Sequence, residues 1–204
     1  MKNLLIILTI LISSVGYSQS GYVSAMEKFL IEHVERSKTP YLFSLNAGKD
    51  SVDFENFNEP LVEYLILKKI NDYRIENNRP LLVEDSLIKN LAKGWSEEMD
   101  STNLFYHNPN AEAMECITMD NGSVKKMTYN EITESVFQVW KNSKGHNYIM
   151  LMEDSYYGSV GVSYTFKGCN EYSDSGVNLC EMFNLKGSYK IYTTFNSINN
   201  LKHL

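Results

Sequence analysis

Residues 128–146 read TYNEITESVFQVWKNSKGH, and this stretch predicts one helix and its two ends. Thr128 followed three positions later by Glu131 is a capping-box pattern, in which a hydroxyl and a carboxylate each satisfy a free amide at the helix start. Apolar residues then recur at helical spacing and define a buried face, formed by Ile132, Val136 and Val139/Trp140. We expect the helix to end in the turn Ser143-Lys144-Gly145, with Gly145 in a left-handed C-cap and His146 directly after it.

Two further helices are predicted upstream. The first begins near Leu61 and stops near Asn77-Asn78, before Pro80, and its apolar face is Val62, Ile66, Ile70 and Tyr73. Asp85 is placed to cap the second helix. Its apolar residues repeat every four positions, and the predicted stripe is Leu87, Leu91, Trp95 and Met99, widened by Ile88 and Ala92.

The pattern changes to strands in the last third of the chain. Residues 159–166 alternate with period two, and 177–185 and 189–195 are further strand candidates. Between the second and third helices, 116–119 and 124–127 flank Asp120-Asn121-Gly122, a sequence that favours a tight turn between two strands. Helices first and antiparallel strands last predict a layered α+β fold rather than a doubly wound parallel one.

The first 18 residues have the layout of a secretory signal peptide. Lys2 precedes the apolar run 4–12, and small or polar residues follow over 13–18, so we expect a mature chain from about Gln19. The alternative is an uncleaved anchor, although nine apolar residues fall well short of the ~20 that span a bilayer. Nothing else in the sequence is apolar enough, so we expect no membrane span after cleavage and a secreted or periplasmic protein.

Composition divides the remaining chain into three parts. Residues 19–60 form an N-terminal extension, with a short amphipathic helix over 22–36 and a linker-like remainder, residues 61–195 form the main domain, and 196–204 form a tail. The chain has 19 Lys+Arg against 25 Asp+Glu, a net charge of -6, and no basic cluster. These features argue against a nucleic-acid partner, which needs a basic face.

Three cysteines are present, an odd number. Cys169 and Cys180 bracket a segment of turn residues, so we predict a disulfide that closes this loop in an oxidising compartment. Cys116 is then the unpaired thiol, and we expect it to be buried and inert rather than a nucleophile. The motifs G-x-S-x-G and H-E-x-x-H are both absent, so two common hydrolase mechanisms have no support in the sequence.

Two of the four histidines are candidates for chemistry. His107 precedes Glu115 by eight positions, and His146 ends the stretch quoted above, whereas His33 and His203 are expected at the surface. Imidazole and carboxylate groups can hold a divalent metal or transfer protons. From spacing alone, a structural role remains the default for each, and Glu115 could simply accept hydrogen bonds from backbone amides and hold His107 in place.

Five segments together are more specific than any of them alone. They are INDYRIENNRPL at 70–81, the 87–99 helix followed by His107, Glu115-Cys116-Ile117, WKNSKGH at 140–146 and GSVGV at 158–162. In this order they resemble the CAP superfamily of cysteine-rich secretory, antigen 5 and pathogenesis-related proteins, also called SCP-like, in its bacterial branch. The resemblance covers about residues 61–195.

The resemblance implies a three-layer α-β-α sandwich with a central antiparallel sheet and an open cleft. His107 and His146 match the two cleft histidines of the family, and Glu115 matches its first acid. Ser143 stands where many members have a second acid. Glu134 is an acid on the same helix, whose direction the sequence leaves open. The resemblance also implies Zn or another divalent cation at His107 and His146 as a candidate cofactor.

Three functions are compatible with these residues. The favoured one is a secreted binding module for a small apolar, glycan or peptide ligand or an envelope component, with no catalysis, since no nucleophile is recognisable. The alternative is a metal-assisted hydrolase acting on peptides or cell-envelope material. A third is an interaction protein that uses the 19–60 extension as its contact surface.

Overall fold

The computed structural model describes residues 47–169 and 186–199, which all belong to one compact unit spanning 43–204. The signal segment, the 22–36 helix and the 177–185 strand lie outside the described residues and stay predictions. In chain order the elements are η1 (Ala47–Lys49), α3 (Glu59–Glu76), α4 (Ser86–Thr102), β1 (Met114–Ser123), α5 (Tyr129–Asn142), α6 (Lys144–Met150), β2 (Tyr157–Gly168) and β3 (Gly187–Ile198).

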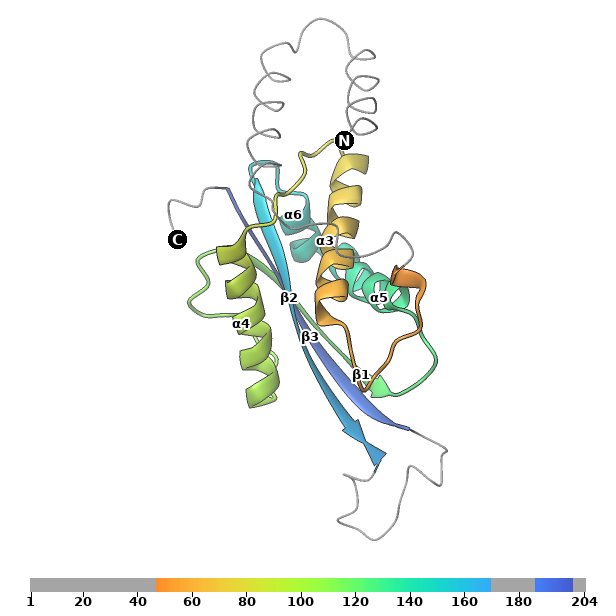
Figure 1. The fold of residues 1–204 in the computed structure, drawn as a ribbon. Coiled ribbons are helices and arrows are strands. Elements are labelled where there is room, and N and C mark those ends of the chain that lie inside the picture. The colour runs from red at the N-terminus through yellow and green to blue at the C-terminus, as the bar shows by residue number, and fades with distance from the viewer. Residues whose placement is uncertain (1–46, 170–185, 200–204) are drawn as a thin grey trace, which may run out of the picture. The chain divides into compact units, whose positions relative to one another are not determined.

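The three strands form one antiparallel sheet in the order β1-β3-β2. Central β3 pairs with both neighbours, so that Phe195 lies opposite Cys116 on one side and Val160 on the other. Helix α4 packs on one face of the sheet, and α3, α5 and α6 cover the other (Figure 1). The expected α+β fold, a three-layer α-β-α sandwich with a central antiparallel sheet, is confirmed.

Helices α3 and α5 begin and end close to where the sequence predicts. Asn58 caps α3 by accepting the Leu61 amide hydrogen, and the capping box at Thr128 starts α5. The expected inner faces are buried and form much of the main core, with Val62, Ile66, Ile70, Ile132, Val136 and Trp140. Of the two alternatives on α5, Trp140 is buried and Val139 is exposed.

Arg74 is fully buried and braces the segments around α6. Its guanidinium donates hydrogen bonds to four backbone carbonyls, those of Pro80, Met150, Met152 and Ser155. Asn71 exchanges two hydrogen bonds with the backbone of Leu82 in the same region. Both residues therefore act as packing and loop-bracing groups.

The buried face of α4 differs from the predicted stripe. Asp85 caps the helix as expected, and Ile88, Ala92 and Met99 of the predicted stripe are buried, but Ser96 is buried with them. Leu87 and Leu91 are 50% and 40% exposed. The reason is close packing: Ser96 Oγ donates to the Gly161 carbonyl, and a Cβ at Gly161 would overlap the backbone of Ala92 and Lys93. Small residues set this face, and hydropathy alone does not reveal it.

The predicted turn at Asp120-Asn121-Gly122 is wrong. Strand β1 runs straight through it, and Asn121 and Gly122 pair with Lys190 and Tyr189 of β3. A two-residue type I′ turn needs positive φ at both central positions, and neither residue has it. The long partner strand outweighs the local turn preference, and the Tyr189 ring lies against Gly122, where a side chain is missing.

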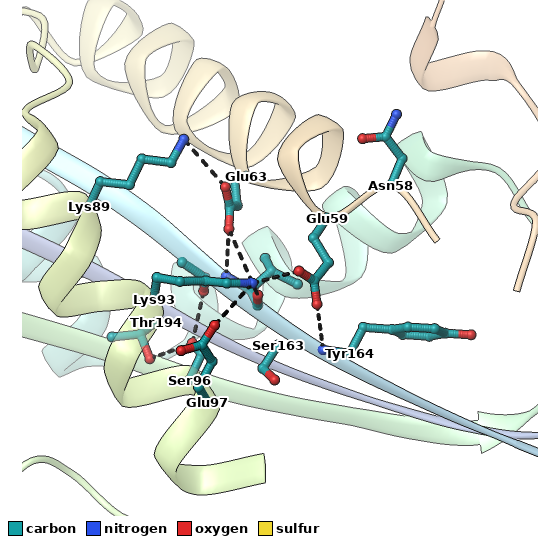
Figure 2. A network of polar contacts seen from close by, with 12 residues as sticks. Asn58, Glu59, Glu63, Lys89, Lys93, Ser96, Glu97, Ser163, Tyr164 and Thr194 are labelled. Carbon is teal, nitrogen blue, oxygen red and sulfur yellow. Dashed lines mark hydrogen bonds and ion pairs between the residues drawn. The ribbon is translucent and has the colours of Figure 1, made fainter. Parts of the chain in front are cut away.

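Side chains from two helices cover the outer edge of β2 (Figure 2). Glu63 and Glu59 of α3 accept hydrogen bonds from the amides of Val162 and Tyr164, at 3.1 and 2.9 Å. Lys93 of α4 donates to the Val162 carbonyl and also pairs with Glu59 at 2.5 Å. These groups occupy hydrogen-bonding positions of a fourth strand at Val162 and Tyr164, so this part of the edge is covered.

The described domain extends beyond the predicted limits of 61 and 195. Val52 donates to the carbonyl of Met127, and Phe54 joins the core, while β3 continues to Ile198. Cys116 is free and buried, as expected. The Cys169–Cys180 disulfide stays a prediction because Cys180 is not among the described residues. Over 47–169 and 186–199, every helix is too short or too polar to cross a bilayer.

Candidate functional site

His107 lies in the loop between α4 and β1, and α4 itself fixes this loop. Asn103 ends the helix in the left-handed conformation, with φ at 54°. The Trp95 indole then donates to the carbonyl of Tyr106 at 3.1 Å, and the two rings meet edge to face at 4.9 Å. The residue directly before His107 is therefore anchored to the helix. The sequence offers no signal for this contact, since Trp95 reads as part of a core stripe.

Glu115, at the start of β1, fixes the orientation of the His107 ring through a hydrogen bond to Nδ1. One carboxylate oxygen, Oε1, accepts the Asn108 amide hydrogen at 3.0 Å and lies 2.8 Å from Nδ1 of His107. A carboxylate only accepts hydrogen bonds, so Nδ1 of His107 is the donor and Nε2 is left free on the opposite side of the ring. The second oxygen, Oε2, is buried and has no hydrogen-bond partner among the described residues.

His146 lies inside a short helix rather than after the end of α5. Ser143 closes α5 and also caps α6, and its hydroxyl accepts the His146 amide hydrogen at 3.5 Å. The expected left-handed C-cap at Gly145 is therefore wrong: Gly145 is helical, and within the described residues the positive-φ glycine is Gly187. A serine hydroxyl restarts the helix directly and removes the need for a glycine turn.

The two imidazoles meet at the outer edge of β1. Their ring centroids are 5.9 Å apart and their planes are inclined by 58°. Because β1 is an edge strand, a loop from the α4 layer and a helix from the opposite layer can approach each other around it. Cys116, on the α6 side of β1, lies with its Sγ 3.7 Å from the His146 carbonyl.

Burial and charge both act on this group of side chains. Burial lowers the pKa of His146, and the nearby His107 lowers it further. His146 is therefore biased toward the neutral form, which is the form that accepts hydrogen bonds or binds metals. Burial raises the pKa of the Cys116 thiol far above its usual range, with a further contribution from Glu115. Cys116 is inert, as the sequence predicts.

Glu134 and Ser143 have other partners. Glu134 is bound by Lys69 of α3 at 2.5 Å and by Gln138, and these hydrogen bonds lower its pKa. Ser143 is occupied as a helix cap. Among the described residues, neither side chain is hydrogen-bonded to the imidazole of His107 or His146, so the structure groups His107, Glu115 and His146, with Cys116 beside them.

These residues do not fit a catalytic zinc site. Such sites use three protein ligands and a water, whereas Glu115 is engaged through Oε1 by Nδ1 of His107, in the position of a carboxylate that supports a ligating histidine. Over 47–169 and 186–199, no three His, Cys, Asp or Glu side chains are arranged to hold a metal ion. Two imidazoles remain as candidate ligands.

An α-β-α domain with a histidine pair at the edge of its sheet, one histidine supported by a buried glutamate, defines the class of this protein. Residues 67–181 match the family described as CAP, the cysteine-rich secretory protein family. This match covers more than half of the chain, and the chain belongs to that family. Comparison with curated proteins gives no match.

Three solved structures are similar to this chain. An extracellular SCP-domain protein from Bacillus anthracis is 21% identical, with a TM-score of 0.42, over 68% of this chain and 41% of its own. An outer surface protein from Borrelia burgdorferi is 12% identical, with a TM-score of 0.40, over 74% and 98%. The CAP domain of enterococcal PrgA is 11% identical, with a TM-score of 0.43, over 90% and 80%.

Proposed function

We propose that this protein is an exported binding module that holds a small apolar, glycan or peptide ligand against His107 and His146. The supporting observation is the hydrogen bond from His107 to Glu115, which orients one ring and leaves its Nε2 free. His146 contributes a second, mainly neutral imidazole 5.9 Å away. Buried polar atoms without partners are rare in folded proteins, and Glu115 Oε2 and His146 Nδ1 retain capacity for a water or a ligand group.

Binding accounts for the site better than hydrolysis. The hydrolase alternative needs a metal-activated water or a nucleophile. The carboxylate that would complete a metal site supports His107 instead, and the one thiol nearby is buried with a raised pKa. A divalent cation held by the two imidazoles remains part of the proposal as an accessory to ligand binding.

The proposed export rests on residues 1–18. Expression in a secreting bacterial host should yield a chain that begins near Gln19, as measured by intact mass. A chain that retains residues 1–18 would contradict cleavage and support the uncleaved anchor instead.

Ligand binding is tested with three probes: decanoate, chitotriose and a mixed hexapeptide library. Histidine Cε1–H signals are followed by NMR, and binding is measured by calorimetry on wild type, His107→Ala, His146→Ala and the control His33→Ala. At least one probe class should bind saturably to wild type and to the control and lose binding in the two site variants. If wild type binds none of the three, or if the site variants bind as well as wild type, the proposal is wrong.

The accessory metal has its own test. Zinc content of the natively purified protein is compared with that of a His107→Ala/His146→Ala variant. We expect a zinc occupancy that depends on both histidines. We also expect no hydrolysis of peptide or peptidoglycan substrates of the kind that is lost on adding a chelator and restored by zinc. Chelator-sensitive, zinc-restored turnover would replace the binding proposal with the hydrolase.

A further inference from the structure

A groove of about 560 Å³ lies at the end of the sheet, and two of the segments that line it adjoin the candidate site in the chain. One wall is the segment 111–114, which leads directly into Glu115. Another wall includes Tyr148 of α6, the helix that carries His146. Two walls of the groove therefore adjoin residues of the candidate site along the chain, one at Glu115 and the other at His146. Its lining side chains that matter here are Glu112, Met114, Tyr148, Met152, Asp154 and Ile198.

Apolar side chains are unusually open along this groove. Tyr148 is 66% exposed and Met114 is 50% exposed, although both flank a preformed hollow. Single exposed apolar residues are ordinary, but several around one concave surface indicate a place where a partner covers them. Tyrosine and methionine also suit such surfaces, since one is a rigid amphipathic ring and the other adapts its shape.

The charges along the groove have one sign. Glu112 and Asp154 are both exposed, and neither has an ion pair or a hydrogen bond with another described side chain. By contrast, the adjacent Glu153 is paired with Arg79 at 2.7 Å. Among the described residues that line the groove there is no lysine or arginine. The groove therefore presents negative potential without an internal counter-charge.

We propose that this groove binds a short peptide segment that carries a lysine or arginine next to an apolar side chain. Its cations lie against Glu112 and Asp154, and its apolar side chain covers Met114 and Tyr148. A fatty chain or a neutral glycan carries no positive charge to pair with Glu112 and Asp154. A cationic peptide does, so the charges of the groove favour it as the ligand. This inference rests on the proposed function, since it names the ligand class for a groove whose walls continue along the chain into the candidate site.

The experiment uses fluorescence anisotropy with labelled hexapeptides and the mature chain. The probe is Gly-Lys-Leu-Gly-Lys-Leu, compared with versions in which both lysines become serine or glutamate. The groove variants are Glu112→Gln/Asp154→Asn and Tyr148→Ala. The matched control is Glu76→Gln/Glu98→Gln, which removes the same charge from two exposed helical acids outside the groove.

We expect the lysine peptide to bind and the glutamate peptide to fail. The groove double variant should weaken binding by about fivefold, as two exposed ion pairs allow, and 0.5 M salt should do the same to wild type. Tyr148→Ala should weaken binding by a similar factor, and the control should stay within about twofold.

The inference is overturned if the lysine peptide does not bind, if the serine peptide binds equally well, or if the groove double variant binds like the control. The titrations of His107→Ala and His146→Ala with decanoate, chitotriose and the hexapeptide library decide the proposed function separately. One result would remove this inference and keep the proposed function. In that result decanoate or chitotriose binds wild type but not His107→Ala, and the groove variants do not change peptide binding.

Discussion

Glu63 accepts a hydrogen bond from the Val162 backbone amide at 3.1 Å, through a side chain that is only 5% exposed. The two residues are 99 positions apart in the sequence, so the contact exists only in the folded domain. The Glu63 carboxylate takes the position that a backbone carbonyl of a neighbouring strand would occupy. Together with Glu59 and Lys93, it covers the edge of β2 at Val162 and Tyr164 (Figure 2).

The first prediction concerns the acceptor and the charge of Glu63. Glu63→Gln keeps an acceptor for Val162, and burial already raises the pKa of Glu63 despite Lys89 and Lys93, so we expect the free energy of unfolding to change by less than about 1 kcal/mol. Glu63→Ala leaves a buried amide unpaired and should cost about 1–3 kcal/mol. Urea unfolding of both variants at pH 7 measures the difference.

The pH dependence of this pair has a definite sign. A raised folded-state pKa means that the folded protein binds more protons than the unfolded chain above the ordinary value of 4.5. Wild type should therefore lose stability relative to Glu63→Gln as the pH rises from 4.5 through the raised pKa, and the difference should then level off. A difference that is flat with pH, or an equal cost for Gln and Ala, would contradict this account.

The second prediction uses two glycines at the α4–β2 interface. Gly161→Ala should destabilise the domain by about 1–3 kcal/mol or more, because its Cβ meets the backbone of Ala92 and Lys93, which cannot move aside as a side chain can. Gly94→Ala has open space around it on α4 and should stabilise by about 0.5–1 kcal/mol through helix propensity. Thermal unfolding of both variants measures the contrast; equal effects would show that the helix does not approach the strand this closely.

Local signals account for most of what the sequence predicts correctly about the fold. Caps at Asp85 and Thr128 depend on side-chain contacts within three residues, so the sequence contains them almost completely. The turn expected at Asn121-Gly122 is wrong because the distant partner strand β3, which pairs with both residues through Lys190 and Tyr189, decides the conformation. On α4 the predicted Ile88, Ala92 and Met99 are buried, but the small residue Ser96 is buried with them, whereas the hydropathy pattern favours Leu87 and Leu91, which are exposed.

The candidate site shows the same division. The matched motif segments predict His107, Glu115 and His146, and the structure places these three together. The direction of Glu134 depends on Lys69, which lies on another helix, so sequence position could not settle it. The groove acids Glu112 and Asp154 carry no motif, because their relevance comes from the hollow between distant segments.

The third prediction concerns Arg74, which donates to four carbonyls while fully buried. Arg74→Met removes every donor at once and should cost about 3 kcal/mol or more. Arg79→Met is the matched control, since it breaks a partly exposed pair with Glu153 and should cost about 1 kcal/mol or less. Chemical unfolding measures both; a similar small cost at both positions would mean that the buried network adds little to stability.

The fourth prediction concerns the protonation of His146. Burial first, and then His107, lowers its pKa below the ordinary 6.5, so its Cε1–H signal should titrate below that value by NMR. His107→Ala removes the second cause and should raise the pKa of His146 only part of the way, because the burial remains. A lowered pKa also means that the unfolded chain binds more protons below pH 6.5, so stability should fall as the pH drops through the folded-state value.

The control for this prediction is His146→Asn. This variant should no longer lose stability as the pH drops below 6.5, and it should keep the pH dependence of stability that Glu63 causes at pH 4.5 and above. His107→Ala separates the two causes, since a full return of the His146 pKa to 6.5 would assign the whole shift to charge rather than burial. A wild-type pKa at or above 6.5 would contradict the arrangement itself, because a half-buried imidazole beside a second one cannot favour its charged form without a carboxylate partner of its own. Glu115, the carboxylate hydrogen-bonded at this site, is bound to His107 instead.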